Sequence, residues 1–144
     1  MNLSQFIARL AARPRQAFIL DSAGGYLSAS VPLIILWKFE AEFGLPRELL
    51  VAMSLTSFLY GSYSLICALR IRSRWSFFLK ILVGANSTYL FALMTYTLIN
   101  LSRLSHLGLA YLLVDHLVLA SVIAIELAAT AGMTRNTTRL LRQR

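Results

Sequence analysis

Four apolar runs, each long enough to cross a bilayer as a helix, constrain the fold more than any other feature. They span residues 16–37, 49–69, 81–101 and 107–133. A hydrocarbon core about 30 Å thick needs roughly 20 helical residues, and a helix satisfies its own backbone hydrogen bonds inside lipid. With 58% hydrophobic and 14% charged residues, the chain is predicted to be an all-α integral membrane protein: a four-helix transmembrane bundle.

Two shorter segments flank this predicted transmembrane domain, residues 16–133. In residues 1–15 the apolar side chains fall at i, i+3, i+4 and i+7, which is typical of an amphipathic helix lying at the membrane interface; they are Leu3, Phe6, Ile7 and Leu10. Residues 134–144 are predicted to form a basic cytoplasmic tail. This tail either continues the fourth helix along anionic headgroups or frays.

The distribution of Lys and Arg predicts the orientation. Eleven of the fourteen cations lie before the first run, between the second and third, or after the fourth. Short flanks rich in these residues stay cytoplasmic, so both termini are predicted to be cytoplasmic in a multi-pass protein of the inner (plasma) membrane. The net charge of +8 is then explained by topology and by anionic lipid headgroups as partners, with no nucleic acid.

Three carboxyl side chains lie inside the predicted spans, where an ionisable group is costly. Asp21 lies in the first span, and Asp115 and Glu126 lie in the fourth. Inserting such a group near mid-bilayer costs about 2.5 kcal/mol or more, so these side chains are expected to face the bundle interior. The spans hold no Lys or Arg, and His116 is their one candidate cation. Protons or cations are therefore the expected ligands.

Depth along the helices sorts the polar side chains into two layers. At about 1.5 Å per residue from the nearest cytoplasmic cation, Asp21 and Asn86 lie about 9 Å and Glu126 about 13 Å into the membrane. Helix two brings two tyrosines and Ser64 to a comparable depth. The candidates for proton or ligand binding are Asp21, Asn86, Glu126, Tyr60 and Tyr63 in the inner layer, and Asp115 and His116 in the outer layer. Tyr60 or Tyr63 is the expected hydrogen-bond partner of the inner carboxyls.

Packing offers an alternative interpretation of the same residues. Polar groups join helices in membrane bundles for about 1 kcal/mol apiece, without any ligand. In the first span, Gly25 and Ala29 have the small-xxx-small spacing that lets helices approach closely, and Pro32 is expected to kink its outer half. The pattern indicates neither a particular cofactor nor a particular metal.

Several short stretches carry a resemblance to a set of small bacterial four-span membrane proteins without known activity. They are Phe18-Ile19-Leu20-Asp21-Ser22-Ala23-Gly24-Gly25, Phe43-Gly44-Leu45-Pro46-Arg47, Tyr63-Ser64-Leu65-Ile66-Cys67 and Ile125-Glu126. The resemblance covers most of the chain and implies a bacterial inner membrane. It implies no activity.

Three classes of function remain open. The first is binding of a proton, cation or small polar ligand at the buried carboxyls, in a transport, channel or sensing role, with a homodimer as one option. The second is a non-catalytic structural or accessory subunit that contacts a larger membrane complex. The third, an intramembrane enzyme, is not expected, because the chain contains no nucleophile elbow, phosphate-binding loop or zinc-protease motif.

The predicted topology can be tested with fusion reporters. A reporter joined after residue 144 is expected in the cytoplasm, and one inserted near Phe43 is expected on the outer side, because cations gather at the opposite ends of the spans. Reporters that fall on the same side of the membrane would contradict the four-span arrangement.

Overall fold

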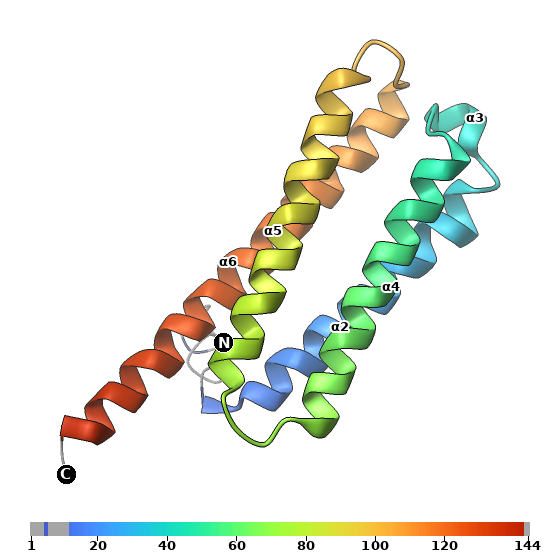
Figure 1. Cartoon of the computed structure of the whole chain (residues 1–144). Coiled ribbons are helices and arrows are strands. Elements are labelled where there is room, and N and C mark those ends of the chain that lie inside the picture. The colour runs from blue at the N-terminus through green and yellow to red at the C-terminus, as the bar shows by residue number, and fades with distance from the viewer. Residues whose placement is uncertain (1–4, 6–11, 143–144) are drawn as a thin grey trace.

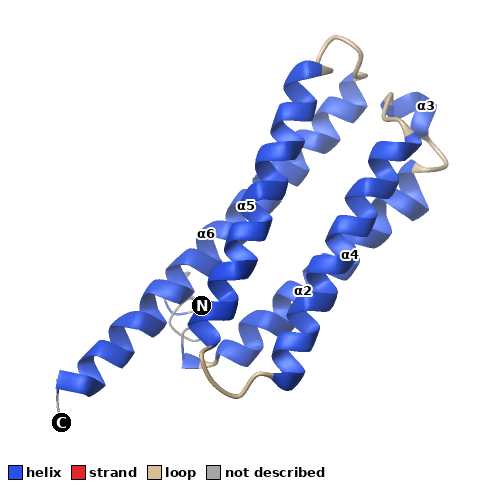
Figure 2. Ribbon diagram, in the orientation of Figure 1, coloured by secondary structure: helices blue, strands red, loops and turns tan. Residues whose placement is uncertain are grey.

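A computed structural model describes residue 5 and residues 12–142 of the 144-residue chain. Within these residues the chain is helical, with turns between the helices and no strand (Figure 2). In chain order the elements are α2 (Pro14–Val31), the π-helix η1 (Pro32–Leu36), α3 (Glu40–Phe43), α4 (Arg47–Arg70), α5 (Trp75–Ile99) and α6 (His106–Arg142). The predicted interfacial helix in residues 1–15 lies almost wholly outside the described residues.

Four of these helices are long and apolar enough to cross a membrane. The qualifying segments are Pro14–Ile34, Arg47–Arg70, Trp75–Ile99 and His106–Met133. The all-α class and the presence of four membrane-length helices are thereby confirmed. Two segments differ from the predicted bounds: α5 begins six residues before residue 81, and α6 continues nine residues beyond 133. The reason is that a charged residue marks the edge of an apolar run but does not end a helix, since Lys and Arg are good helix formers.

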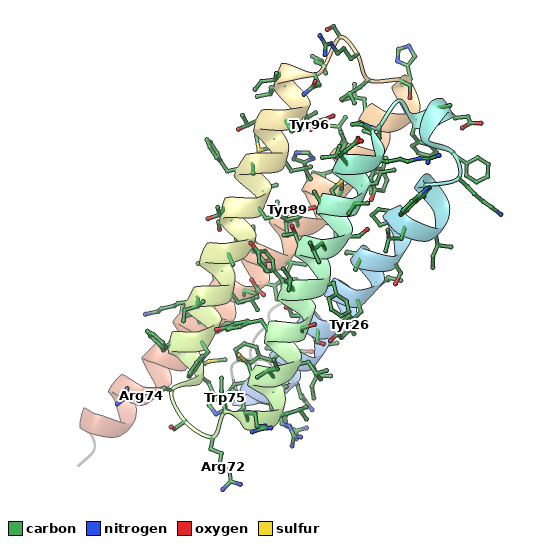
Figure 3. The ribbon with its side chains drawn as sticks, turned by 45° about the vertical axis from the view of Figure 1, so that its right-hand side comes forward. Tyr26, Arg72, Arg74, Trp75, Tyr89 and Tyr96 are labelled. Atoms are coloured by element: carbon green, nitrogen blue, oxygen red, sulfur yellow. The ribbon has the colours of Figure 1, made fainter. Side chains whose placement is uncertain are left out.

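The helices pack as two antiparallel hairpins (Figure 1). Helix α2 lies along α4, and α5 lies along α6, with fewer contacts between the two pairs. The turn between α4 and α5 carries Arg72 and Arg74 at one end of the bundle, next to Trp75 at the start of α5 (Figure 3). Arg74 adopts a left-handed conformation, with φ 58°. The last turns of α6 extend past this end of the bundle (Figure 1).

Two glycines hold α2 against α4. A Cβ added to Gly25 would lie 2.8 Å from the Gly61 Cα and 3.0 Å from the Ser57 carbonyl oxygen. These distances are too short for any side chain, so the two backbones touch here. Gly25 was expected at a helix contact, and the structure identifies Gly61 as the residue opposite it. Ala29, the second small residue of the predicted spacing, is buried.

Apolar side chains fill the two ends of the bundle. The inner cluster, near the α4–α5 turn, combines residues from all four long helices: Ala17, Phe18, Cys67, Ala68, Leu79, Leu82, Ala129 and Met133. The outer cluster, at the opposite end, contains Leu45, Leu50, Met53, Leu93 and Leu112. Ring contacts support both ends, with Phe18 on Trp75 at 5.9 Å and Phe43 on Tyr111 at 6.3 Å between centroids.

The outer connection between α2 and α4 is tied to α6. The Ser105 hydroxyl donates to the Glu42 carbonyl at 2.7 Å, and the Phe43 carbonyl lies directly over Gly108, where a Cβ would overlap it. From Pro32 the first span continues as a π-helical turn, in which the Trp37 N–H donates to the Pro32 carbonyl at 3.0 Å. The kink expected at Pro32 stays a prediction.

Enlarging Gly61 should weaken the α2–α4 contact. In Gly61→Leu the added atoms would meet the α2 backbone, since even a Cβ would lie 3.2 Å from the Ser22 carbonyl oxygen. Overpacking of this kind costs about 1–3 kcal/mol, so thermal unfolding in detergent, followed by circular dichroism, should occur at lower temperature. Gly84→Leu is the control, because nothing lies within 4 Å of an added Cβ there. Equal losses in the two variants would contradict the proposed close contact.

Candidate functional site: a cavity with buried carboxyls

A cavity of about 220 Å³ lies between the two apolar clusters, in the middle of the bundle. All four long helices line it, and α2 and α6 contribute most of the surface. The lining residues are Ala17, Leu20, Asp21, Gly24, Gly25, Ser28, Ser57, Tyr60, Asn86, Tyr89, Asp115, Val118, Leu119, Val122, Ile125, Glu126 and Ala129. The wall is therefore apolar for most of its extent, with acidic groups near each end.

Each helical hairpin supplies one hydrogen-bonded pair at the inner end of the cavity. In the first hairpin the Ser64 hydroxyl of α4 donates to the Asp21 carboxyl of α2 at 2.5 Å. In the second hairpin the Asn86 amide of α5 donates to Glu126 Oε2 of α6 at 3.2 Å. Asp21 and Glu126 also interact directly with each other. We call these two residues the carboxyl pair.

The glycine contact between α2 and α4 explains why Ser64 reaches Asp21. Asp21 lies one turn before Gly25, and Ser64 lies nearly one turn after Gly61, so both polar groups share the face along which the two helices touch. A short hydroxyl bridges helices that lie this close together. In the second hairpin the side chains of Asn86 and Glu126 are buried, at 5% and 6% exposure.

One oxygen of the carboxyl pair has no protein donor. Glu126 Oε1 is fully buried and has no hydrogen-bond partner among the described residues. Ionised carboxylates only accept hydrogen bonds. If both members of the pair were ionised, neither could donate to the other, and two negative charges would lie side by side. A buried acceptor without a donor costs about 1–3 kcal/mol. A proton or a bound cation between the two carboxyls would remove that cost.

The outer end of the cavity carries a second acidic group beside aromatic rings. Asp115 interacts electrostatically with Tyr89 and Tyr111. Tyr89 lies on the side of α5 that faces α4 (Figure 3) and contacts the Tyr60 ring edge to face, with centroids 6.3 Å apart. Tyr89 also forms a side-chain hydrogen bond with Ser57. Two tyrosine rings thus separate the outer carboxyl from the carboxyl pair on the α4 and α5 side.

The structure brings together three of the residues that the sequence singled out. Asp21, Asn86 and Glu126 meet at the inner end of the cavity. Tyr60 and Asp115 also line the cavity. The hydroxyl beside Asp21, however, belongs to Ser64 and not to a tyrosine. Ser64 follows Gly61 on the face of α4 that touches α2, whereas the Tyr63 hydroxyl reaches α5 instead.

Two other candidates lie away from the cavity. The Tyr63 hydroxyl donates to the Phe78 carbonyl of α5 at 3.2 Å, which links the two hairpins near the inner cluster. His116 uses Nδ1 to bond the Leu112 carbonyl of its own helix, and it does not line the cavity. The imidazole therefore satisfies a local backbone group, although it interacts electrostatically with its neighbour Asp115.

Sequence reasoning did not select Tyr89 or Ser64 as site residues. Tyr89 follows Asn86 by three residues, so the two share a helical face, and that spacing was a signal that could have identified it. Ser64 was assigned to the right depth, but its role depends on the contact between Gly25 and Gly61, which joins distant parts of the chain.

The described residues contain no group of three or more His, Cys, Asp or Glu side chains arranged to hold a metal ion. The chain matches no protein-family model, no curated protein and no solved structure.

Removing the Asn86 amide should destabilise the fold by isolating Glu126. Asn86→Leu leaves Glu126 Oε2 without its donor, and the expected loss is about 1 kcal/mol. Unfolding in mixed micelles monitored by circular dichroism would measure it. Ser87→Leu, at the adjacent exposed position, serves as the control. If both variants unfold like the wild type, the hydrogen bond between Asn86 and Glu126 contributes nothing to stability.

Proposed function

We propose that this protein is a multi-pass protein of a bacterial inner membrane, with both termini in the cytoplasm. The support for membrane insertion is the set of four membrane-length apolar helices, and the support for the orientation is the gathering of Lys and Arg at one side of the spans. In this orientation the α4–α5 turn and its arginines lie against anionic lipid headgroups, which are the expected surface partner.

Within this bundle, we propose that the carboxyl pair binds a proton, or a cation in its place. The observation that carries the proposal is the direct contact between Asp21 and Glu126, combined with the buried and unpartnered Oε1 of Glu126. A shared proton supplies the missing donor. Because the pair borders a cavity, a cation that enters the cavity can replace that proton.

The charges around the cavity support a cationic ligand. Its titratable groups are Asp21 from α2, Tyr60 from α4, Tyr89 from α5, and Asp115 and Glu126 from α6. None of the residues that line it is Lys, Arg or His. An anion entering here would meet carboxyl oxygens without a compensating positive charge, whereas a cation would be stabilised by them.

A binding role in transport or sensing fits the cavity better than the alternatives. The lining serines, Ser28 and Ser57, are accompanied by no histidine or lysine that could act as a general base, so we propose that the protein is not an enzyme. A purely structural or accessory role remains the second candidate from the sequence, but a cavity lined by carboxyls from two helices favours ligand binding over packing alone.

Infrared spectroscopy of the carboxyl stretch would test the proton-binding proposal. The wild-type protein in lipid vesicles at neutral pH is expected to show the band of a protonated carboxyl, and Glu126→Gln should fold normally while losing that band. The amide of glutamine can donate to Asp21 as the protonated carboxyl does, so the hydrogen bond persists without the proton.

Ser87→Ala, a change outside the cavity, should leave the spectrum unchanged. The proposal would be overturned by a wild-type protein without a protonated carboxyl near pH 7. The same conclusion would follow from a band that persists unaltered in Glu126→Gln.

A further inference from the structure

Among residues 12–142, apolar side chains close both ends of the bundle, which leaves its side as the way into the cavity. The inner and outer apolar clusters occupy the ends. Between them, α2 and α6 supply most of the cavity wall but pack little against each other. Leu20 of α2 and Val118 of α6 both line the cavity, yet they are 51% and 53% exposed. These two side chains therefore mark an opening between α2 and α6.

Gly24 keeps this opening wide. It lines the cavity, and nothing lies within 4 Å of a Cβ added to it. Its neighbour Gly25 has the opposite surroundings, pressed against Gly61. The two adjacent glycines thus have different consequences: one permits a helix contact, and the other leaves space beside the carboxyl pair.

The size of the cavity exceeds what a proton or a bare metal ion requires. Cavities of about 150 Å³ hold a benzene-sized molecule, and one water occupies about 30 Å³ of liquid. A cavity of about 220 Å³ therefore accommodates a small organic molecule. Aliphatic side chains such as Leu119 and Val122 would contact its apolar part. Tyr60 and Tyr89 also line the cavity, and aromatic rings attract cations.

We propose that the cavity takes a small organic ammonium ion with an apolar body, which enters between α2 and α6 from the hydrocarbon phase. The positive nitrogen lies against the carboxyl pair, and the apolar body fills the space beside Gly24. On binding, the shared proton of the pair leaves, so one positive charge replaces another and the net charge of the site is unchanged. This inference rests on the proposed function and names the class of its ligand.

Proton release on addition of a defined probe would test the proposal. The purified protein in weakly buffered detergent would be titrated with benzyltrimethylammonium chloride while the pH is followed. A saturable release of up to one proton per chain is expected. Equal concentrations of sodium chloride, or of neopentylbenzene, the uncharged carbon isostere, should release none. Release by sodium at the same concentration would overturn the proposal in favour of an inorganic cation site.

Two variants on opposite sides of the opening locate the binding site. Gly24→Leu and Val118→Phe should each weaken the apparent affinity for benzyltrimethylammonium at least tenfold, because their side chains fill the opening. Gly84→Leu, on the surface of α5 where space is also free, should bind as the wild type does. Circular dichroism would verify folding. Unchanged affinity in both cavity variants would overturn the proposal, and so would a second copy of the chain covering the opening in the detergent-solubilised protein.

Failure of this inference can be told apart from failure of the proposed function. The infrared band of the protonated carboxyl would be recorded with and without the probe. A band that is present but insensitive to benzyltrimethylammonium would leave proton binding intact and refute the organic ligand. Absence of the band in the wild type would refute the proposed function itself.

Discussion

The contact between Gly25 and Gly61 determines where the polar groups of this bundle can meet. It sets α2 and α4 so close together that the Ser64 hydroxyl spans the gap to Asp21. Lipid tails provide no hydrophobic force between helices, so close backbone packing of small residues is a main source of helix association in membranes. With α2 held in this way, Asp21 is directed toward Glu126 on the other hairpin. The carboxyl pair thus depends on two residues that have no side chains.

The second hairpin is built by different means. Glycine contacts of this kind do not join α5 to α6, and Gly84 faces open space. Helices α5 and α6 are joined instead by the hydrogen bond between the buried Asn86 and Glu126, and by the larger side chains of the apolar clusters. Between the hairpins the links are spread along the bundle: the Phe18–Trp75 and Phe43–Tyr111 ring contacts lie at its two ends, and the carboxyl pair and the Tyr60–Tyr89 contact lie between them.

The sequence predicted the parts of this arrangement that follow from lipid solvation. Charge placement predicted the four membrane-length helices. Depth from the nearest cation predicted one layer for Asp21, Asn86 and Glu126, since an unpaired carboxyl is too costly to face lipid. The choice between Ser64 and a tyrosine could not be predicted, because it depends on how closely two helices approach. The cavity could not be predicted either, since the open space beside Gly24 arises from the distance between α2 and α6 and not from any local pattern of residues.

The position of the carboxyl pair along the bundle also has an electrical consequence. In the proposed orientation the pair lies roughly a third of the way across the hydrocarbon core from the cytoplasm, at a depth of about 9–13 Å. Moving one elementary charge through the full membrane potential is worth about 2.3 kcal/mol per 100 mV. A positive charge that travels between the outer surface and this pair crosses about two thirds of the field, so each 100 mV of resting potential would favour its occupancy by about 1.5 kcal/mol, or roughly tenfold. The proposed exchange behaves differently, because a departing proton and an arriving organic cation carry the same charge over the same fraction of the field, so exchange with ions from one side of the membrane would be almost insensitive to voltage.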